Sequence, residues 1–244
     1  ANTWSGISLD EERGLAIFGT GSPAYDFYGG NRPGANLFSD SIVAVDARTG
    51  ERVWHYQVIP HDVWDRDMPS APTLATIEKD GESLDVVIAA TKQGHVYVLD
   101  RDTGKPVHPM KELAVPASTI PGETTPATIR VPLKPAPIAR TQFTRDMITT
   151  RTQAAHDAVA ERVAAFRYEG LFTPPSLEGT IFLPDYAGAS SWGGGAFDPR
   201  TGIYYINARE NAAVVQMVEK PPLDEVVSAS QLYAARCASC HGAG

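Results

Sequence analysis

The chain has 244 residues, 43% of them hydrophobic and 20% charged, so it is long and apolar enough to bury a core. Its formal net charge of −8 argues against a nucleic-acid partner, which would require a basic surface. It has no run of about 18 apolar residues, the length that a membrane span needs. Because it starts at Ala1 and stops at Gly244, we expect an internal piece of a longer protein, so a missing targeting signal says nothing about location.

Two segments near opposite ends of the chain share one hairpin pattern. In both, a Trp is followed six residues later by an Asp and four residues after that by a Gly, and an apolar run comes next. The two sets are Trp4, Asp10, Gly14 and Trp192, Asp198, Gly202. The Asp side chain starts a tight turn and the Gly supplies the positive φ that closes it, so both segments are predicted β-hairpins.

A second hairpin type has an apolar strand followed by Asp-x-x-Thr-Gly, and it occurs at residues 41–50 and 95–104. Short strands, regular turn signals and internal repeats indicate an all-β fold, here a partial β-propeller of about three blades. Each blade would hold four antiparallel strands. We expect blades at about 4–58 and 71–107 and a third that starts near Thr180, too few to close a ring.

The propeller portion is expected to cover residues 1–207, with an irregular insert at 105–168. Residues 105–140 are rich in Pro and Thr and indicate a loop with extended pieces. A helix is predicted near 152–166, since apolar residues recur there at helical spacing. Residues 208–227 are interpreted as a linker, and a short helix is predicted from Ser228 to Arg236.

The only two cysteines lie in the last eight residues, in the run Cys237-Ala-Ser-Cys240-His241. C-x-x-C-H is typical of covalent haem c, with both thiols bonded to the haem and the His as an axial iron ligand. A redox dithiol or half of a zinc site are the alternatives. Zinc would need a second ligand pair, and a dithiol would need a βαβ setting. We therefore interpret residues 228–244 as the start of a cytochrome c domain.

The run from His61 to Asp67 concentrates three carboxylates, a histidine and a tryptophan directly after a strand-like segment, 52–58. It is either a solvated loop or a site, because catalytic groups often lie on loops that rigid strands hold in place.

Four motifs in chain order bear on this choice. They are residues 26–34 (Asp-Phe-Tyr-Gly-Gly-Asn-Arg-Pro-Gly), 61–65 (His-Asp-Val-Trp-Asp), 91–101 (Thr-Lys-Gln-Gly-His-Val-Tyr-Val-Leu-Asp-Arg) and 168–176 (Tyr-Glu-Gly-Leu-Phe-Thr-Pro-Pro-Ser). With the hairpins and the haem motif, they resemble the PQQ-dependent (quinoprotein) dehydrogenases of the glucose-dehydrogenase-like branch, with a fused cytochrome c domain. The resemblance implies an eight-bladed propeller that holds pyrroloquinoline quinone (PQQ) on its axis, with calcium against it.

Three residues take reactive or cofactor-binding roles by this resemblance. Trp4 would stack under the PQQ ring system, although a blade-core tryptophan is the alternative. Asp65 would be the catalytic base that takes the hydroxyl proton. Lys92 would stabilise negative charge on the quinone oxygens, whereas the alternative is a solvated turn lysine.

Other positions are less determined. Trp192 either borders the cofactor or is a blade tryptophan. Ser22 replaces the Asn that relatives use as a calcium ligand, and a hydroxyl is a weaker ligand. His61, Asp62 and Trp64 are expected to shape the substrate pocket or to hold the Asp65 loop. Asp67 is expected to be structural or solvated.

The resemblance implies oxidation of an alcohol or sugar hydroxyl, with hydride passing to PQQ and electrons to haem c. A cytochrome or the respiratory chain would accept the electrons, and the protein would work in the periplasm, with membrane association left open. The alternative is a cofactor-less propeller scaffold fused to a haem c electron carrier. The joint presence of Trp4, Asp65 and Lys92 argues against this scaffold.

Overall fold

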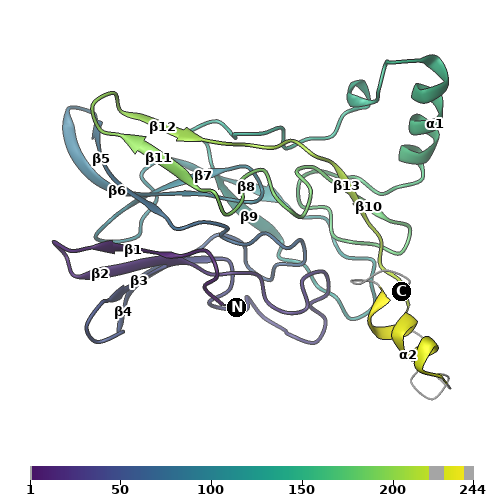
Figure 1. Cartoon of the computed structure of the whole chain (residues 1–244), viewed down its shortest axis with the longest axis horizontal. Coiled ribbons are helices and arrows are strands. Elements are labelled where there is room, and N and C mark those ends of the chain that lie inside the picture. Colours follow the sequence, from purple (N-terminus) through teal and green to yellow (C-terminus); the bar gives the residue numbers. More distant parts are fainter. Residues whose placement is uncertain (1, 220–227, 239–244) are drawn as a thin grey trace.

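The computed structural model describes residues 2–219 and 228–238, and most of its regular structure is β-sheet. Figure 1 shows sheets arranged one above another, with their hairpin turns toward one side and irregular loops toward the other. Within the described ranges no helix is long and apolar enough to cross a membrane.

The first sheet is a four-stranded antiparallel meander in the order β1-β2-β3-β4. Its strands are β1 (Ile7–Asp10), β2 (Leu15–Gly19), β3 (Ser41–Asp46) and β4 (Arg52–Gln57). The predicted turn between β3 and β4 is confirmed, because Oδ1 of Asp46 accepts hydrogen bonds from the amides of Arg48 and Thr49, both at 2.9 Å. Gly50 closes it with a φ of 75°.

The second sheet has three strands, not the predicted four. It contains β5 (Thr73–Lys79), β6 (Glu82–Ala90) and β7 (Val96–Asp100), all antiparallel. The Asp100 turn forms as expected, with Oδ1 accepting from the Thr103 amide at 2.8 Å. Beyond the turn, pairing with β7 is reduced to an isolated bridge between Leu99 and Pro106. Proline has no N–H to donate, and a ladder does not continue through it.

The predicted third blade is divided between two small sheets. The second Trp–Asp–Gly segment forms the expected hairpin, β11 (Gly195–Asp198) with β12 (Ile203–Ile206). However, β10 (Thr180–Phe182) pairs with β13 (Ala213–Val215), which lies in the range predicted as a linker. That prediction is corrected here: a strand of three residues is too short to show a periodic pattern.

The insert is more regular than expected, since β8 (Met110–Ala114) and β9 (Thr128–Pro132) pair as a hairpin within it. A short 3-10 turn, η1 (Arg145–Met147), follows. The predicted helix is confirmed as α1 (Gln153–Ala164), and Thr152 caps it by accepting from the Ala155 amide at 3.1 Å. The second predicted helix is α2 (Ala229–Arg236), with Ser228 as its N-cap.

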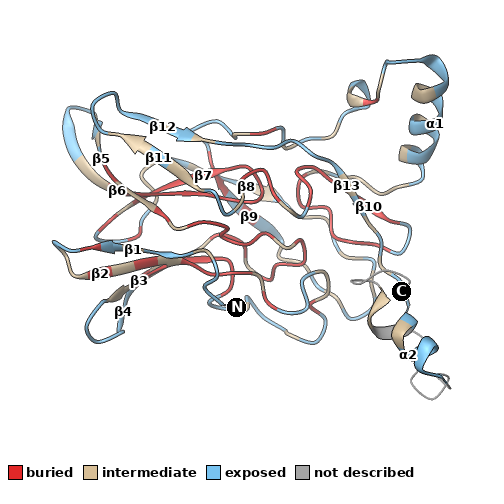
Figure 2. Ribbon diagram, in the orientation of Figure 1, coloured by how far each residue is buried: buried red, intermediate tan, exposed pale blue. Residues whose placement is uncertain are grey.

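The core lies between the sheets, and β6 contributes to both of its parts. Val87 and Ala89 pack into a large cluster with residues of β2 and β3, whereas Val86, Ile88 and Ala90 face a second cluster against β11 and β12. This follows from the two-residue period of a strand. Figure 2 shows buried segments in red along β2, β3 and β7 and also through the loops beyond the strands. Those loops carry the candidate site.

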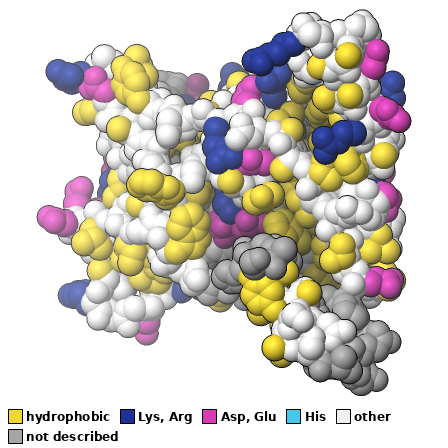
Figure 3. Space-filling view, turned by 45° about the vertical axis from the view of Figure 1, so that its right-hand side comes forward, with side chains coloured by type: hydrophobic (Ala, Val, Ile, Leu, Met, Phe, Trp, Pro, Cys, Tyr) yellow, Lys and Arg dark blue, Asp and Glu magenta, His cyan; other side chains and the backbone are white. Residues whose placement is uncertain are grey.

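Several large apolar side chains stay exposed on the outer strands, among them Ile7, Leu9, Val53 and Tyr205. The space-filling view shows hydrophobic side chains spread over much of one face, with charged groups mostly toward its margins (Figure 3).

We expect Ile17→Ala to lower the free energy of unfolding by about 2–5 kcal/mol, because Ile17 is fully buried and its loss leaves a cavity in the larger cluster. Urea denaturation of the full-length protein measures this. The matched control is Val53→Ala in the same sheet, where the side chain is 52% exposed and a change of about 0.5 kcal/mol or less is expected. Equal losses for the two variants would contradict the core assignment.

Candidate active site

The run from His61 to Asp67 is a buried loop that follows β4, so the solvated-loop interpretation is wrong. His61, Asp62, Trp64 and Arg66 are all buried. Val63, Trp64 and Met68 belong to the larger hydrophobic cluster, which anchors the loop on the sheets. Charged side chains held at such a place must find partners, since an unpaired buried charge is strongly unfavourable.

Asp62 shapes this loop from within. Its Oδ1 accepts a hydrogen bond from the Trp64 amide at 2.8 Å, and its Oδ2 accepts one from the Arg66 amide at 2.7 Å. Between these two amides stands Asp65, whose φ of 56° is unusual for a residue other than glycine. Trp64 donates from Nε1 to the carbonyl of Thr173 at 3.0 Å. Asp62 and Trp64 were expected either to shape the substrate pocket or to hold the Asp65 loop. Their contacts are those of residues that hold the loop.

Arg66 joins the loop to a distant segment. Its guanidinium donates to the carbonyls of Asp185 and Pro184, each at 2.9 Å, and lies 5.4 Å from the ring centroid of Phe182. Complete burial lowers the pKa of Arg66 to about 10, which leaves it charged at neutral pH.

Lys92 follows the end of β6 and is the cation of the site. Its Nζ lies 2.6 Å from Oδ2 of Asp67 and 2.9 Å from Oδ2 of Asp65. It is 7% exposed, so the alternative of a solvated turn lysine is wrong. Its carbonyl accepts from the Ala189 amide at 2.8 Å, and a Cβ built on Gly188 would lie 2.5 Å from Lys92 Cγ. The loop after β10 therefore packs directly on this lysine.

Asp67 is not solvated, contrary to one of the two alternatives given above. It is buried, pairs with Lys92, and accepts from the Ser22 amide through Oδ1 at 2.6 Å. Asp65 and Asp67 are two residues apart, and the carboxylates of both reach the ammonium group of Lys92.

Two carboxylates share the one ammonium group, and their pKa values move apart. Burial raises the pKa of Asp65 to about 7, although the charge of Lys92 opposes this rise. Burial also acts on Asp67, but the charge and hydrogen bond of Lys92 prevail and lower the pKa of that carboxyl. Burial works against the charged form of Lys92, yet the two carboxylates raise its pKa. Separated pKa values in neighbouring groups are typical of acid–base sites.

Trp4 lies beside this charge cluster. A Cβ built on Gly21 would be 2.8 Å from Oδ1 of Asp67 and 3.1 Å from Nε1 of Trp4, so the indole edge and the carboxylate flank the same glycine. The indole is 45% exposed, which does not fit the alternative of a blade-core residue. The structure thus brings together Trp4, Asp65 and Lys92, which are far apart in the sequence.

Ser22 faces carboxylates. Its hydroxyl is 2.7 Å from Oδ2 of Asp62 and 3.2 Å from Oδ1 of Asp40, a residue not singled out from the sequence. Burial, and then the charges of Asp62 and Asp67, hold the pKa of Asp40 well above its usual value. Calcium takes 6–8 oxygen ligands. In the described part of the chain no group of three or more His, Cys, Asp or Glu side chains could hold a metal ion. These residues alone do not fit a calcium site.

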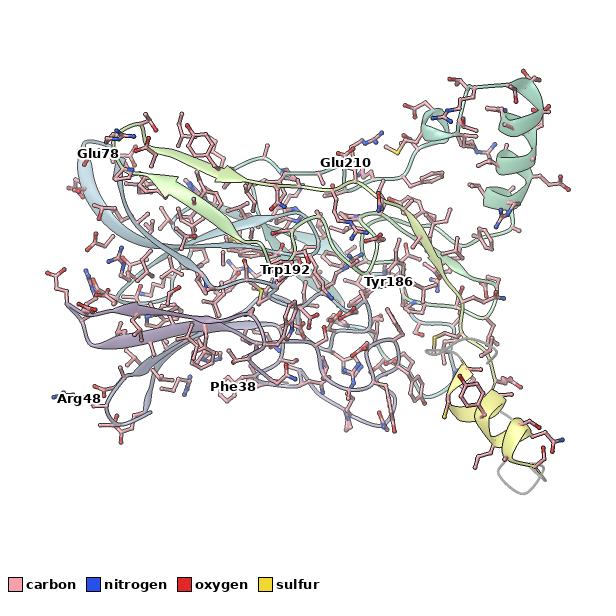
Figure 4. All side chains as sticks on the ribbon, in the orientation of Figure 1. Phe38, Arg48, Glu78, Tyr186, Trp192 and Glu210 are labelled. Carbon is pink, nitrogen blue, oxygen red and sulfur yellow. The ribbon has the colours of Figure 1, made fainter. Side chains whose placement is uncertain are left out.

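The remaining site residues predicted from the sequence are Trp192, Cys237, Cys240 and His241. Trp192 is 79% exposed, which does not fit a buried blade tryptophan, and Figure 4 shows it near the start of β11. Cys237 is a half-buried free thiol at the end of α2. Cys240 and His241 lie outside the described residues.

A cavity of about 340 Å³ between α1 and β10 does not coincide with this charge cluster. Its lining includes Phe143, His156, Tyr168 and Ile181 but neither Asp65 nor Lys92. The candidate site is therefore defined by the paired charges and not by the cavity.

The sequence matches the family described as "PQQ: Glucose/ethanol/alcohol dehydrogenase, beta-propeller domain" over residues 1–239. The chain belongs to this family. It is 34% identical to the quinoprotein glucose dehydrogenase of Escherichia coli over 228 residues, 91% of this chain and 28% of that protein. It is 31% identical to the quinate/shikimate dehydrogenase (quinone) of Acinetobacter baylyi, covering 94% of this chain and 29% of that protein.

Among solved structures, the quinohemoprotein alcohol dehydrogenase of Comamonas testosteroni is similar, with a TM-score of 0.57 and 25% identity over 87% of this chain and 26% of that one. The mostly-β fold is thus that of a quinoprotein propeller fragment. The chain spans little more than a quarter of the length of these relatives.

We expect Lys92→Met to destabilise the cofactor-free protein by about 3 kcal/mol at pH 8, because it leaves two buried carboxylates without their cation. Below pH 7 the loss should shrink, since Asp65 then takes up a proton. Urea denaturation at the two pH values measures both effects. The exposed Lys105→Met is the control, with about 0.5 kcal/mol or less expected. A loss that does not depend on pH would contradict the pairing.

Proposed function

We propose that the full-length protein oxidises an alcohol or sugar hydroxyl with PQQ bound beside Trp4 and Lys92, and that Asp65 is the base. The observation that carries this proposal is the Asp65–Lys92–Asp67 ion-pair cluster next to the exposed indole of Trp4. The family supports it, as do relatives named as glucose, quinate and glycerol dehydrogenases.

The residues present fit such a cofactor. Trp4 offers a half-exposed flat indole for a flat ring system. Lys92 offers a fixed positive charge for oxygens that become negative during reduction. When bound, the quinone supplies a hydride acceptor.

Asp65 has the properties that a general base needs. With a pKa of about 7, it is ionised in a large fraction of molecules at neutral pH, yet it holds a proton far more readily than an ordinary aspartate. Its left-handed backbone conformation is held by Asp62, which fixes the amides on both sides. When Asp65 accepts the hydroxyl proton and becomes neutral, the ammonium group of Lys92 stays paired with the carboxylate of Asp67.

Haem c, calcium and the periplasm belong to the same proposal. The C-x-x-C-H motif and a relative named as a quinohemoprotein alcohol dehydrogenase support electron transfer to haem c, bound through Cys237 and Cys240 with His241 on the iron. Electrons would leave to a further cytochrome or the respiratory chain. Calcium beside Ser22 would need ligands beyond the residues described. The scaffold alternative is disfavoured because Trp4, Asp65 and Lys92 lie together.

We expect Asp65→Asn to lower kcat/KM by about 100-fold or more, because an amide cannot take the proton. The assay uses the full-length protein with PQQ, Ca²⁺ and an artificial electron acceptor, tested on D-glucose, quinate, glycerol and ethanol. In the unchanged protein kcat/KM should rise with pH and level off above about 7, as Asp65 ionises. The exposed Asp146→Asn is the matched control and should behave as the unchanged protein does. Full activity of Asp65→Asn with bound PQQ would rule out the base assignment.

For the haem, replacing Cys237 and Cys240 by Ala together should abolish covalent haem c, because both thioether bonds are lost. The pyridine haemochrome spectrum of the denatured protein measures this. PQQ-dependent reduction of an artificial acceptor should persist. A haem signal that stays unchanged would refute the attachment site.

A further inference from the structure

Glu123 comes from the insert, 62 residues beyond His61, and yet its carboxylate is buried against the catalytic loop. Its side chain is 3% exposed, and Oε1 lies 2.9 Å from Nε2 of His61. The other oxygen, Oε2, accepts a short hydrogen bond from the Gly29 amide. One insert residue therefore contacts two separate loops, the glycine-rich loop 26–34 and the catalytic loop 61–67.

Both ring nitrogens and the amide of His61 have hydrogen-bond partners. Its Nδ1 donates to the carbonyl of Gly34 at 2.8 Å, and its amide donates to the carbonyl of Ala35 at 3.1 Å. Its φ of 48° lies in the left-handed region, which is unfavourable for histidine and persists only where surrounding contacts impose it. The bond to Glu123 is one of these contacts.

The packing around Gly29 is tight. A Cβ built on Gly29 would lie 2.6 Å from His61 Nε2 and 3.1 Å from Arg32 Cζ. Arg32 in turn donates from Nη2 to the carbonyl of Asp62 at 2.5 Å. The contact of Glu123 with His61 and that of Arg32 with Asp62 thus both reach the first two residues of the catalytic loop.

This cluster continues to the catalytic carboxylate through one residue. Asp62 holds the amides of Trp64 and Arg66, and these amides flank Asp65. Among the described residues Asp65 forms its ion pair with Lys92, whereas Glu123 pairs with His61 and makes no direct contact with Asp65. An effect of Glu123 on Asp65 must therefore pass through the backbone of residues 61–64.

We propose that Glu123 is a positioning residue for Asp65, and that the insert thereby sets the geometry of the catalytic loop. This rests on the proposed function of Asp65 as base. Since small displacements of a catalytic group lower rates steeply, loss of this contact should lower turnover more than it lowers substrate or cofactor binding.

The test compares Glu123→Ala, Glu123→Gln and the control Glu112→Ala in the full-length protein with PQQ and Ca²⁺. Glu112 lies exposed on β8 of the same insert. Glu123→Ala should lower kcat by about 10- to 100-fold, with KM and the PQQ dissociation constant within about twofold. Glu123→Gln keeps one acceptor oxygen and should lie between, while the control stays unchanged. A kcat equal to that of the control, or a rise in KM without a fall in kcat, would overturn the proposal.

Hydrogen exchange gives a second readout that does not need turnover. The amides of Trp64 and Arg66 should exchange about tenfold faster or more in Glu123→Ala than in the control, because the loop opens more often. If these amides respond but no substrate is oxidised even by the unchanged protein, the proposed function fails while the contact stands. If turnover is normal and neither exchange nor kcat responds, the positioning role is refuted.

Discussion

The site depends on one ammonium group held between two carboxylates. Asp65, Asp67 and Lys92 are all largely removed from water, and none of these charges is favourable there without the others. Lys92 is placed by the end of β6 and by the loop after β10, and the carboxylates by Asp62 and Ser22. The proposed reactivity therefore depends on how precisely these separate segments are positioned relative to one another.

Local patterns predicted the local structure well. The Asp–Gly turns at Asp46 and Asp100 and the two helices depend on neighbours within a few residues, and all of them are confirmed. The family resemblance then selected Asp65 and Lys92, which the structure brings together. The predictions that failed concerned non-local pairing. Neither the absence of a fourth strand after β7 nor the pairing of β13 with β10 follows from neighbouring residues.

Glu123 shows why part of the site was out of reach of sequence reasoning. It lies in a Pro- and Thr-rich segment without periodicity, and its partners are Gly29 and His61. No spacing rule connects such positions. The segment that was expected to be an irregular insert is instead joined to the loop 61–67 by buried polar contacts, and it contains the β8–β9 hairpin.

The contacts of Trp64 and Arg66 also have a consequence for folding order. They reach carbonyls 109 and 118–119 residues further along the chain, whereas the strands of the first two sheets pair with near neighbours. Closing loops of such length is slow compared with forming hairpins. During synthesis the first two sheets can form early, whereas the loop 61–67 cannot make these contacts until residues 173–185 have been synthesised. The geometry of the candidate site would then be among the last features to form.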